Sequence, residues 1–253
     1  MLGHANLGTG DRKVVVLNDW LCDTSSWDAA RPYIDDVRFR WAFSDLRGYG
    51  RSRGQRSAFT AEEGASDVLA LADALGWQRF AIVGHSMSSL VALHLAQHAS
   101  DRVARAVLIT PPPPSGFGYD DETLEAVRAL GFGDDERRTA ALKQMLGERL
   151  SERWLSFKLA RWRATSDAEA VAGYVPLFGR RGVPEPTIPV ACPVLAVTGE
   201  EDAEPMRSEA VTRAFGAIAE RLTVAPIAQC GHYPMQEAPP LLVATVERFL
   251  AEA

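Results

Sequence analysis

The most constraining feature of this sequence is the stretch Phe80–Ser88, in which an apolar run ends at the Gly-His-Ser-Met-Ser sequence of residues 84–88. An amphipathic segment follows at once, so the pattern predicts a strand, a sharp turn and a helix. Such a turn strains its central residue and needs small residues on both sides, because strand and helix approach closely there. Ser86 would then expose its hydroxyl at the carboxyl edge of a sheet. The Met87 amide would lie at a helix N-terminus, where a developing oxyanion is favoured.

Apolar, β-branched runs recur along the chain and alternate with segments of helical periodicity. Strands are expected at 13–17, 39–43, 80–83, 103–110, 192–198 and 222–227. Thr60 and Glu63 form a capping-box pattern before a helix that stops at Gly76, and Thr24 or Ser25 is expected to cap a helix extending to Ile34. This alternation predicts an α/β protein whose mostly parallel, doubly wound sheet carries helices on both faces.

Three more motifs follow predicted strands. They are Asp-Leu-Arg-Gly-Tyr-Gly-Arg-Ser at 45–52, Gly-Glu-Glu-Asp at 199–202, and Gly-His at 231–232 with Glu-Ala-Pro at 237–239. Together with the turn around Ser86, they resemble the motifs of the α/β-hydrolase family, and the resemblance runs from about Lys13 to Leu250. It implies the α/β-hydrolase fold, in which residues 45–52 form a structural turn stabilised by Asp45 and Arg47, with direct substrate contact as the alternative for this motif.

The resemblance also implies a Ser-His-Asp triad, with Ser86 as nucleophile, Asp202 as acid and His232 as base. A serine hydroxyl is a poor nucleophile at neutral pH, so His232 would remove its proton while Asp202 orients the imidazole. Glu200 and Glu201 are rivals of Asp202, which is preferred by its register in the Gly-x-x-Asp motif. The remaining histidines near this turn, at 85, 94 and 98, are expected to be structural or on the surface.

The pattern changes after Pro111. Four prolines are followed by about 75 residues without a strand-like run, with helical stretches near 122–130, 136–146, 152–164 and 168–177. We therefore expect a helical cap at 113–187, inserted into a core made of residues 1–112 and 188–253. Trp154, Trp162 and Tyr174 are candidate substrate contacts, and packing inside the cap is the alternative for each.

The oxyanion hole is where this sequence departs from the family pattern. Asn18-Asp19 stands where His-Gly is usual, and the resemblance assigns the two oxyanion-hole amides to Trp20 and Met87. A carboxylate about 4 Å from an oxyanion would oppose it by roughly 4 kcal/mol at an effective dielectric of 20. Asp19 is therefore expected to turn its carboxylate away from the site.

Composition narrows the class of partner. A formal net charge of -6 argues against nucleic acid, and no basic amphipathic stretch suggests a membrane surface. No signal-like N-terminus or membrane-length apolar run is present, so a cytoplasmic location is expected. The three cysteines lie far apart in the sequence, which indicates that they are reduced thiols. No metal cluster, phosphate loop or dinucleotide motif is visible, so we expect a small-molecule substrate and no metal or cofactor. The oligomeric state is left open.

The predicted function is hydrolysis of an ester, thioester or lactone of a small, largely apolar molecule through an acyl-enzyme. The alternatives are a carbon-carbon bond hydrolase of ring-cleavage products, a cofactor-free dioxygenase and a non-catalytic, ligand-binding signalling protein of the same fold. The intact acid motif weakens the dioxygenase alternative. The unusual Asn18-Asp19 pair keeps the binding protein open.

Overall fold

The computed structural model of the protein describes residues 1–147 and 149–252. These residues form a seven-stranded sheet of order β1-β3-β2-β4-β5-β6-β7. The strands are β1 (His4–Leu7), β2 (Arg12–Leu17), β3 (Phe39–Ser44), β4 (Phe80–His85), β5 (Val103–Ile109), β6 (Val194–Gly199) and β7 (Leu222–Ile227). Only the β1–β3 pairing within this sheet is antiparallel. The predicted α/β class and mostly parallel sheet are therefore confirmed.

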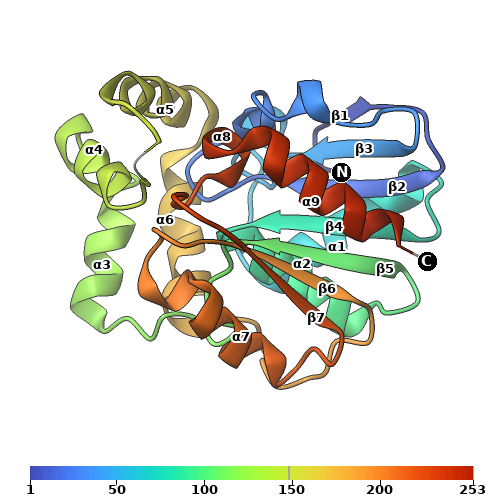
Figure 1. Ribbon diagram of the computed structural model, residues 1–253. Helices are drawn as coiled ribbons and strands as arrows, with labels where there is room; N and C mark the ends of the chain where they lie inside the picture. The colour runs from blue at the N-terminus through green and yellow to red at the C-terminus, as the bar shows by residue number, and fades with distance from the viewer. Residues whose placement is uncertain (148, 253) are drawn as a thin grey trace.

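Helices cover both faces of the sheet (Figure 1). One face packs against α1 (Ala61–Ala74), α2 (Met87–His98) and α7 (Ser208–Gly216), and the other packs against α9 (Pro239–Ala251), which follows the short α8 (Pro234–Glu237). Alternate residues of a strand enter different cores, so that Ile82 faces α2 whereas Val83 faces α9. Because the central strands are covered on both sides, they read as continuous apolar runs rather than as alternating patterns.

Four α-helices, followed by a short π-helix at Leu177–Arg181, lie between β5 and β6 in the described residues, where the cap was expected. The α-helices are α3 (Asp121–Ala129), α4 (Asp135–Lys143), α5 (Glu152–Thr165) and α6 (Ala168–Pro176). Figure 1 places α3, α4 and α5 beyond the carboxyl ends of the strands, where they face the loops that follow β2, β4 and β7. The division into a cap at 113–187 and a core at 1–112 and 188–253 is kept as a proposal on this basis.

The segment after β2 differs from the expectation. In place of a helix extending to Ile34, two short 3-10 helices occur, Thr24–Trp27 and Arg31–Tyr33. The cap is Asp23, whose side chain accepts a hydrogen bond from the Ser25 amide. The prediction of a longer helix capped at Thr24 or Ser25 was therefore wrong, because the Thr24 hydroxyl donates to Asp45. At α1, by contrast, Thr60 accepts from the Glu63 amide as the capping pattern predicted.

Every described helix is too short or too polar to cross a membrane.

Candidate active site

The turn between β4 and α2 has the strained geometry that its sequence predicts. Ser86 has a φ of 54° and a ψ of -122°, a conformation that is unusual for a residue with a side chain. A Cβ atom at Gly84 would lie 2.5 Å from the Ser88 carbonyl oxygen, so only glycine fits there. Ser88, which replaces the usual glycine, turns its hydroxyl back onto the turn, accepting from the His85 amide at 3.0 Å and donating to the His85 carbonyl at 3.1 Å.

The structure brings Ser86, His232 and Asp202 into one hydrogen-bonded chain. Their side chains come from the ends of β4, β7 and β6, which lie at the same edge of the sheet. The Ser86 Oγ lies 2.8 Å from the His232 Nε2, and the His232 Nδ1 lies 2.7 Å from the Asp202 Oδ2. With the proton on Nδ1 donated to the carboxylate, Nε2 is left to accept the proton of the serine hydroxyl. The arrangement can therefore activate that hydroxyl as a nucleophile.

His232 is oriented by more than its carboxylate. The Glu237 side chain accepts from the amides of Gly231 and Tyr233 on either side of it, at 2.8 and 3.0 Å, and the His232 amide donates to the Met145 carbonyl at 2.9 Å. Burial lowers the pKa of His232, but the charge and hydrogen bond of Asp202 more than offset this, so the pKa is raised above its ordinary value. The site thus favours the imidazolium that forms when His232 takes a proton.

The two acidic neighbours of Asp202 lie in different surroundings. The Glu200 carboxylate accepts from the hydroxyls of Thr198 and Ser208, each at 3.0 Å. Glu201 donates its amide to the Cys230 carbonyl, at 2.9 Å. Asp202 is the acid whose carboxylate reaches the imidazole, in agreement with the register of the Gly-x-x-Asp motif.

The other histidines near the turn occupy supporting positions. His85 is buried, and its Nε2 donates to the His232 carbonyl at 2.7 Å. Burial and the neighbouring His232 lower the pKa of His85 to about 3, so its ring is neutral. His94 and His98 lie in α2, where His98 is exposed and contacts Glu185.

The 45–52 motif scaffolds the loop after β2. The Asp45 Oδ1 accepts from the amide and hydroxyl of Thr24, both at 2.8 Å, and its Oδ2 accepts from the Arg51 amide at 3.0 Å. The Arg47 guanidinium binds Asp67 on α1 through two hydrogen bonds of 2.7 and 2.8 Å. These are the structural contacts that the motif led us to expect.

The candidate oxyanion residues occupy the expected loops. Met87 directly follows Ser86 and begins α2. Trp20 follows β2 and lines the same cavity as Ser86, while its indole Nε1 donates to the carbonyl of Val171 in α6 at 2.7 Å. The Asp19 carboxylate accepts from the amides of Leu21 and Cys22 through Oδ1, and from the Ser26 hydroxyl and the Lys158 ammonium through Oδ2. Each oxygen of the Asp19 carboxylate therefore accepts from two donors, and none of these donors belongs to Ser86 or His232.

A cavity of about 440 Å³ opens over Ser86 and His232. Apart from the polar groups already described, its lining is mainly apolar and comes largely from the cap and the loops leading to it. The lining includes Phe117, Tyr119, Val127, Leu130, Ala141, Met145 and Phe178. A substrate there would be surrounded by carbon atoms beyond its reacting carbonyl.

Trp154, Trp162 and Tyr174, predicted as substrate contacts, are not among the described residues that line this cavity. Trp154 donates to Gln236, Trp162 packs against Trp20, and Tyr174 packs against Tyr49 and Phe59. All three thus make packing or hydrogen-bond contacts, but these contacts are with residues of the core, whereas the alternative had placed them inside the cap.

Sequence reasoning missed one polar residue near the site, Lys158 of the cap. Its signal is visible in retrospect, since Leu155 and Trp162 lie three residues before and four residues after it and both are buried. A lysine on the buried stripe of a helix needs a partner.

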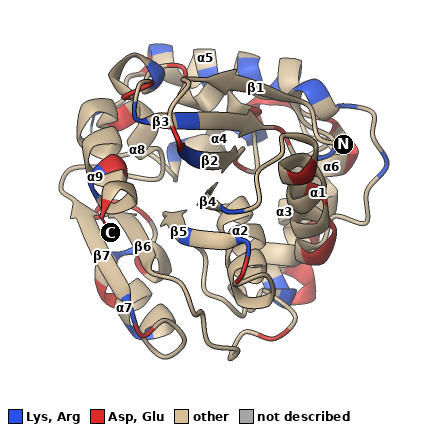
Figure 2. Ribbon diagram, turned by 90° about the vertical axis from the view of Figure 1, so that its right-hand side faces the viewer, with Lys and Arg blue, Asp and Glu red and all other residues tan. Residues whose placement is uncertain are grey.

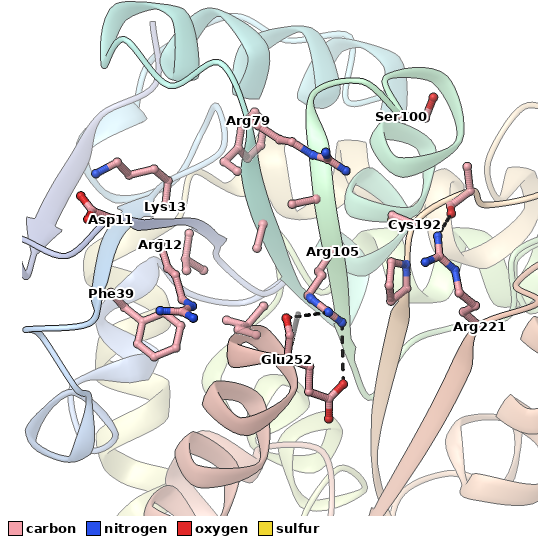
Figure 3. Close-up of a pocket in the computed structure, with 17 residues that line it drawn as sticks. Asp11, Arg12, Lys13, Phe39, Arg79, Ser100, Arg105, Cys192, Arg221 and Glu252 are labelled. Carbon is pink, nitrogen blue, oxygen red and sulfur yellow. Dashed lines mark hydrogen bonds and ion pairs between the residues drawn. The ribbon is translucent and has the colours of Figure 1, made fainter.

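A second hollow, of about 640 Å³, lies at the opposite, amino ends of the strands (Figure 3). Figure 2 views the molecule from this end and shows basic residues at several strand starts. Arg105, for example, donates to the Glu252 carbonyl at 2.8 Å, and the lining combines five Lys and Arg residues with apolar ones. The hydrogen-bonded serine and histidine open into the smaller cavity, so the candidate active site lies at the carboxyl ends.

Comparison with known proteins places this geometry in a family. The family model for the alpha/beta hydrolase fold matches residues 13–234. A bifunctional esterase/perhydrolase of Acinetobacter calcoaceticus is 35% identical over 113 residues, which are 44% of this chain and 41% of that protein. A pimeloyl-[acyl-carrier protein] methyl ester esterase of Sodalis glossinidius is 36% identical over 146 residues, 55% of this chain and 53% of that protein. The chain thus matches about half the length of these relatives.

Solved structures match over nearly the whole chain. The enol-lactonase of Burkholderia xenovorans superposes with a TM-score of 0.83 and 22% identity, covering 99% of this chain and 96% of the other. At this level of identity the likeness establishes a shared fold.

Proposed function

Because this chain belongs to the alpha/beta hydrolase family, we propose that it hydrolyses an ester, thioester or lactone of a small, largely apolar molecule. The observation that carries the proposal is the chain from Ser86 through His232 to Asp202, with links of 2.8 and 2.7 Å, beside an apolar cavity of about 440 Å³. Relatives described as esterases support the same reaction class.

In the proposed reaction, the Ser86 oxygen attacks the substrate carbonyl carbon while its proton passes to the His232 Nε2. The carbonyl oxygen becomes an oxyanion, for which the amides of Trp20 and Met87 are the proposed donors. Collapse of this intermediate expels the alcohol or thiol, which takes the proton back from His232. Water, deprotonated by His232, then attacks the acyl-enzyme, releasing the acid and restoring the Ser86 hydroxyl.

The surroundings of Asp19 support a hydrolase over a non-catalytic binding protein. The replacement of His-Gly by Asn18-Asp19 raised the second possibility, because a free carboxylate beside the site would oppose an oxyanion. Since the Asp19 carboxylate is bonded to Lys158 and Ser26 at 2.9 Å each, its charge is balanced locally. A neutral, apolar substrate is favoured because charged lining groups are already paired within the protein.

Labelling with a fluorophosphonate probe, followed by peptide mapping, tests the proposal. We expect the adduct on Ser86, and we expect wild-type protein to hydrolyse members of a panel of p-nitrophenyl esters and lactones. Ser86→Ala should abolish both, with a loss of turnover of about 10⁶-fold. Ser100→Ala, which alters an exposed serine just after α2, is the matched control and should retain both. Wild-type activity in Ser86→Ala, or a wild type without labelling or turnover, would refute the assignment.

A further inference from the structure

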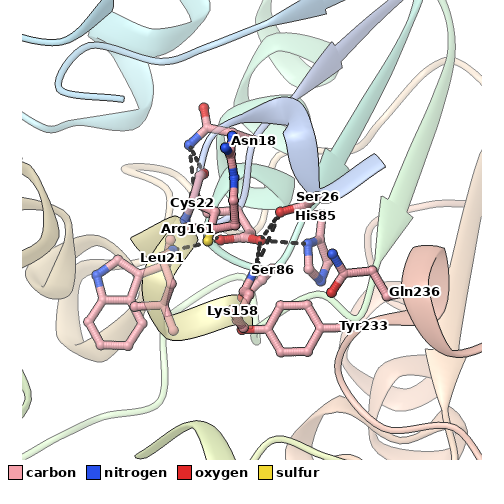
Figure 4. Close-up of polar contacts among 12 residues, drawn as sticks. Asn18, Leu21, Cys22, Ser26, His85, Ser86, Lys158, Arg161, Tyr233 and Gln236 are labelled. Atoms are coloured by element: carbon pink, nitrogen blue, oxygen red, sulfur yellow. Dashed lines mark hydrogen bonds and ion pairs between the residues drawn. The ribbon is translucent and has the colours of Figure 1, made fainter. Parts of the chain in front are cut away.

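Lys158 is a buried cation in the middle of cap helix α5. Its side chain is 1% exposed. The ammonium lies 2.9 Å from the Asp19 Oδ2 and 3.2 Å from the Ser26 Oγ, with the Tyr233 ring 4.3 Å away (Figure 4). A buried ammonium persists only where a partner compensates for lost hydration. Lys158 therefore belongs to a built polar cluster that joins the cap to the loop after β2.

Asp19 shapes the loop that carries the Trp20 amide. Its Oδ1 accepts from the amides of Leu21 at 2.6 Å and Cys22 at 2.8 Å, so one carboxylate oxygen fixes the turn just after Trp20. Asn18 completes the turn, because its side-chain amide donates to the carbonyls of Asp19 and Cys22. The pair that replaces His-Gly thus builds the loop from side-chain hydrogen bonds.

One face of α5 holds this loop along its length. Besides Lys158, Arg161 donates to the Ser25 hydroxyl, and the Thr165 hydroxyl accepts from the Asp23 amide at 3.2 Å. Positions 158, 161 and 165 are spaced for a single helix face. The cap and the loop are therefore connected as one unit.

We propose that Lys158 is a positioning residue for the reaction: its ammonium neutralises Asp19, so that the Asp19 carboxylate can shape the Trp20 loop without opposing the oxyanion that forms when Ser86 attacks the substrate carbonyl. The inference rests on the proposed function, since it concerns the negative charge of that reaction's intermediate. Lys158 acts through Asp19 and touches no reacting atom.

The groups that face Asp19 support this division of charge. Lys158 approaches from α5, His85 from β4 with its Nδ1 3.8 Å from the carboxylate, and His232 and Tyr233 from the loop after β7. Burial raises the pKa of Asp19, yet the charge and hydrogen bond of Lys158, with the hydrogen bond from the Leu21 amide, outweigh it and bring the pKa to about 2. Because His85 is neutral at working pH, Lys158 supplies the balancing charge.

Removing Lys158 alone should leave Asp19 buried and uncompensated. With p-nitrophenyl butyrate, we expect Lys158→Met to lower kcat about 100-fold with little change in KM, since the repulsion acts on the transition state. Adding Asp19→Asn should restore kcat to within about tenfold of wild type, because the amide oxygen can still accept from the two loop amides. Lys143→Met, which breaks an exposed ion pair with Glu152 in the same cap, is the matched control and should behave as wild type.

The pH profile separates this role from a packing role. In Lys158→Met, burial raises the pKa of Asp19, which is neutral below that pKa and charged above it. Its kcat should therefore fall on the alkaline side, where wild type is flat, and the fall should vanish in the double variant. A Lys158→Met enzyme with wild-type kcat, or one that Asp19→Asn does not rescue, overturns the inference.

Asp19→Asn by itself provides a test that does not require Lys158→Met to fold. It should retain kcat within about tenfold of wild type, and a loss of 1,000-fold or more would show that the carboxylate charge itself serves the reaction. Fluorophosphonate labelling of wild type at Ser86 distinguishes a failure of the proposed function from a failure of the inference about Lys158. If wild type is labelled and active but the Lys158 variants are unaffected, only the role of Lys158 is refuted. If wild type is inactive, both the function and the role of Lys158 are refuted.

Discussion

Two buried carboxylates, Asp202 and Asp19, lie after strands on opposite sides of β4 in the sheet order. Asp202 follows β6 and pairs with His232, whereas Asp19 follows β2 and pairs with Lys158 of the cap. The difference lies in the partners. An imidazole exchanges its proton near neutral pH, whereas a lysine beside a carboxylate stays charged. Burial lowers the pKa of Lys158, but the Asp19 charge and hydrogen bond outweigh this and raise the pKa above its ordinary value. Similar carboxylates at one edge of a sheet are thus paired with a titratable imidazole in one place and with a fixed positive charge in another.

The largest expected effect falls on the Asp202 side. Asp202→Asn should lower kcat by about 10³ to 10⁴-fold, because the imidazole loses the acceptor that fixes its tautomer and stabilises its charged form. Steady-state kinetics with p-nitrophenyl esters measures this loss. Glu201→Gln is the control, and a greater loss in that variant would place the acid one residue earlier.

Folding stability should rank the two pairs in the opposite order. Lys158→Met should lower the free energy of unfolding by about 3 to 5 kcal/mol, because it leaves a buried charge without a partner. Asp202→Asn should lower it by only about 1 kcal/mol, the size of one hydrogen bond. Urea unfolding at neutral pH compares them. An equal or greater loss in Asp202→Asn would remove the distinction between a structural pair and the pair that we propose to be catalytic.

Near His232 the cap contributes shape rather than charge. Ala141 of α4 lines the cavity, so Ala141→Leu should shorten the substrates that fit and shift relative kcat/KM toward short acyl chains by about tenfold or more. A series of p-nitrophenyl esters of increasing chain length measures the shift. The neighbouring Ala140 is exposed, so Ala140→Leu should leave the preference unchanged. Equal shifts in both variants would mean that the cavity does not hold the acyl chain.

The smallest expected effect is a displacement, along the pH axis, of the acid limb of the pH profile of kcat/KM. His232 must be neutral to act as a base, and its pKa is raised, so activity should fall as pH drops through a midpoint above the ordinary imidazole value. Asp202→Asn removes the charge that raises this pKa and should move the midpoint down. Lys158→Met removes a charge that lowers it and should move the midpoint up.

The exposed His98 provides the control for these profiles, since its pKa is also raised but it lies in α2 at a distance from the reacting groups. His98→Gln should leave the acid limb unchanged. If Asp202→Asn and Lys158→Met displaced the acid limb in the same direction, the result would contradict the opposite effects of the Asp202 and Lys158 charges on the His232 pKa.

Much of the fold and the serine-histidine-aspartate chain was predictable, because the signals involved are local. Three of these signals lie within short stretches of chain. They are the apolar run that contains Ile82 and Val83, the small residues around Ser86, and the distance of Asp202 from its strand end. Parallel strands place their carboxyl ends at one edge, so motifs after β4, β6 and β7 had to meet. The short β1 was missed, because four residues of mixed character give a weak signal. The two 3-10 helices after β2 were missed, because a cap at Asp23 also gives a weak signal.

By itself, the sequence determined the α/β class, the strained turn at Ser86 and the register of Asp202 with His232. Only the tertiary structure decided that Lys158 meets Asp19 across 139 positions of chain, and that Trp162 and Tyr174 pack inward while Phe117 and Phe178 line the cavity. The physical reason is that local backbone preferences act between near neighbours in the chain. The compensation of a buried charge and the lining of a cavity depend on how helices of the cap pack against a distant loop.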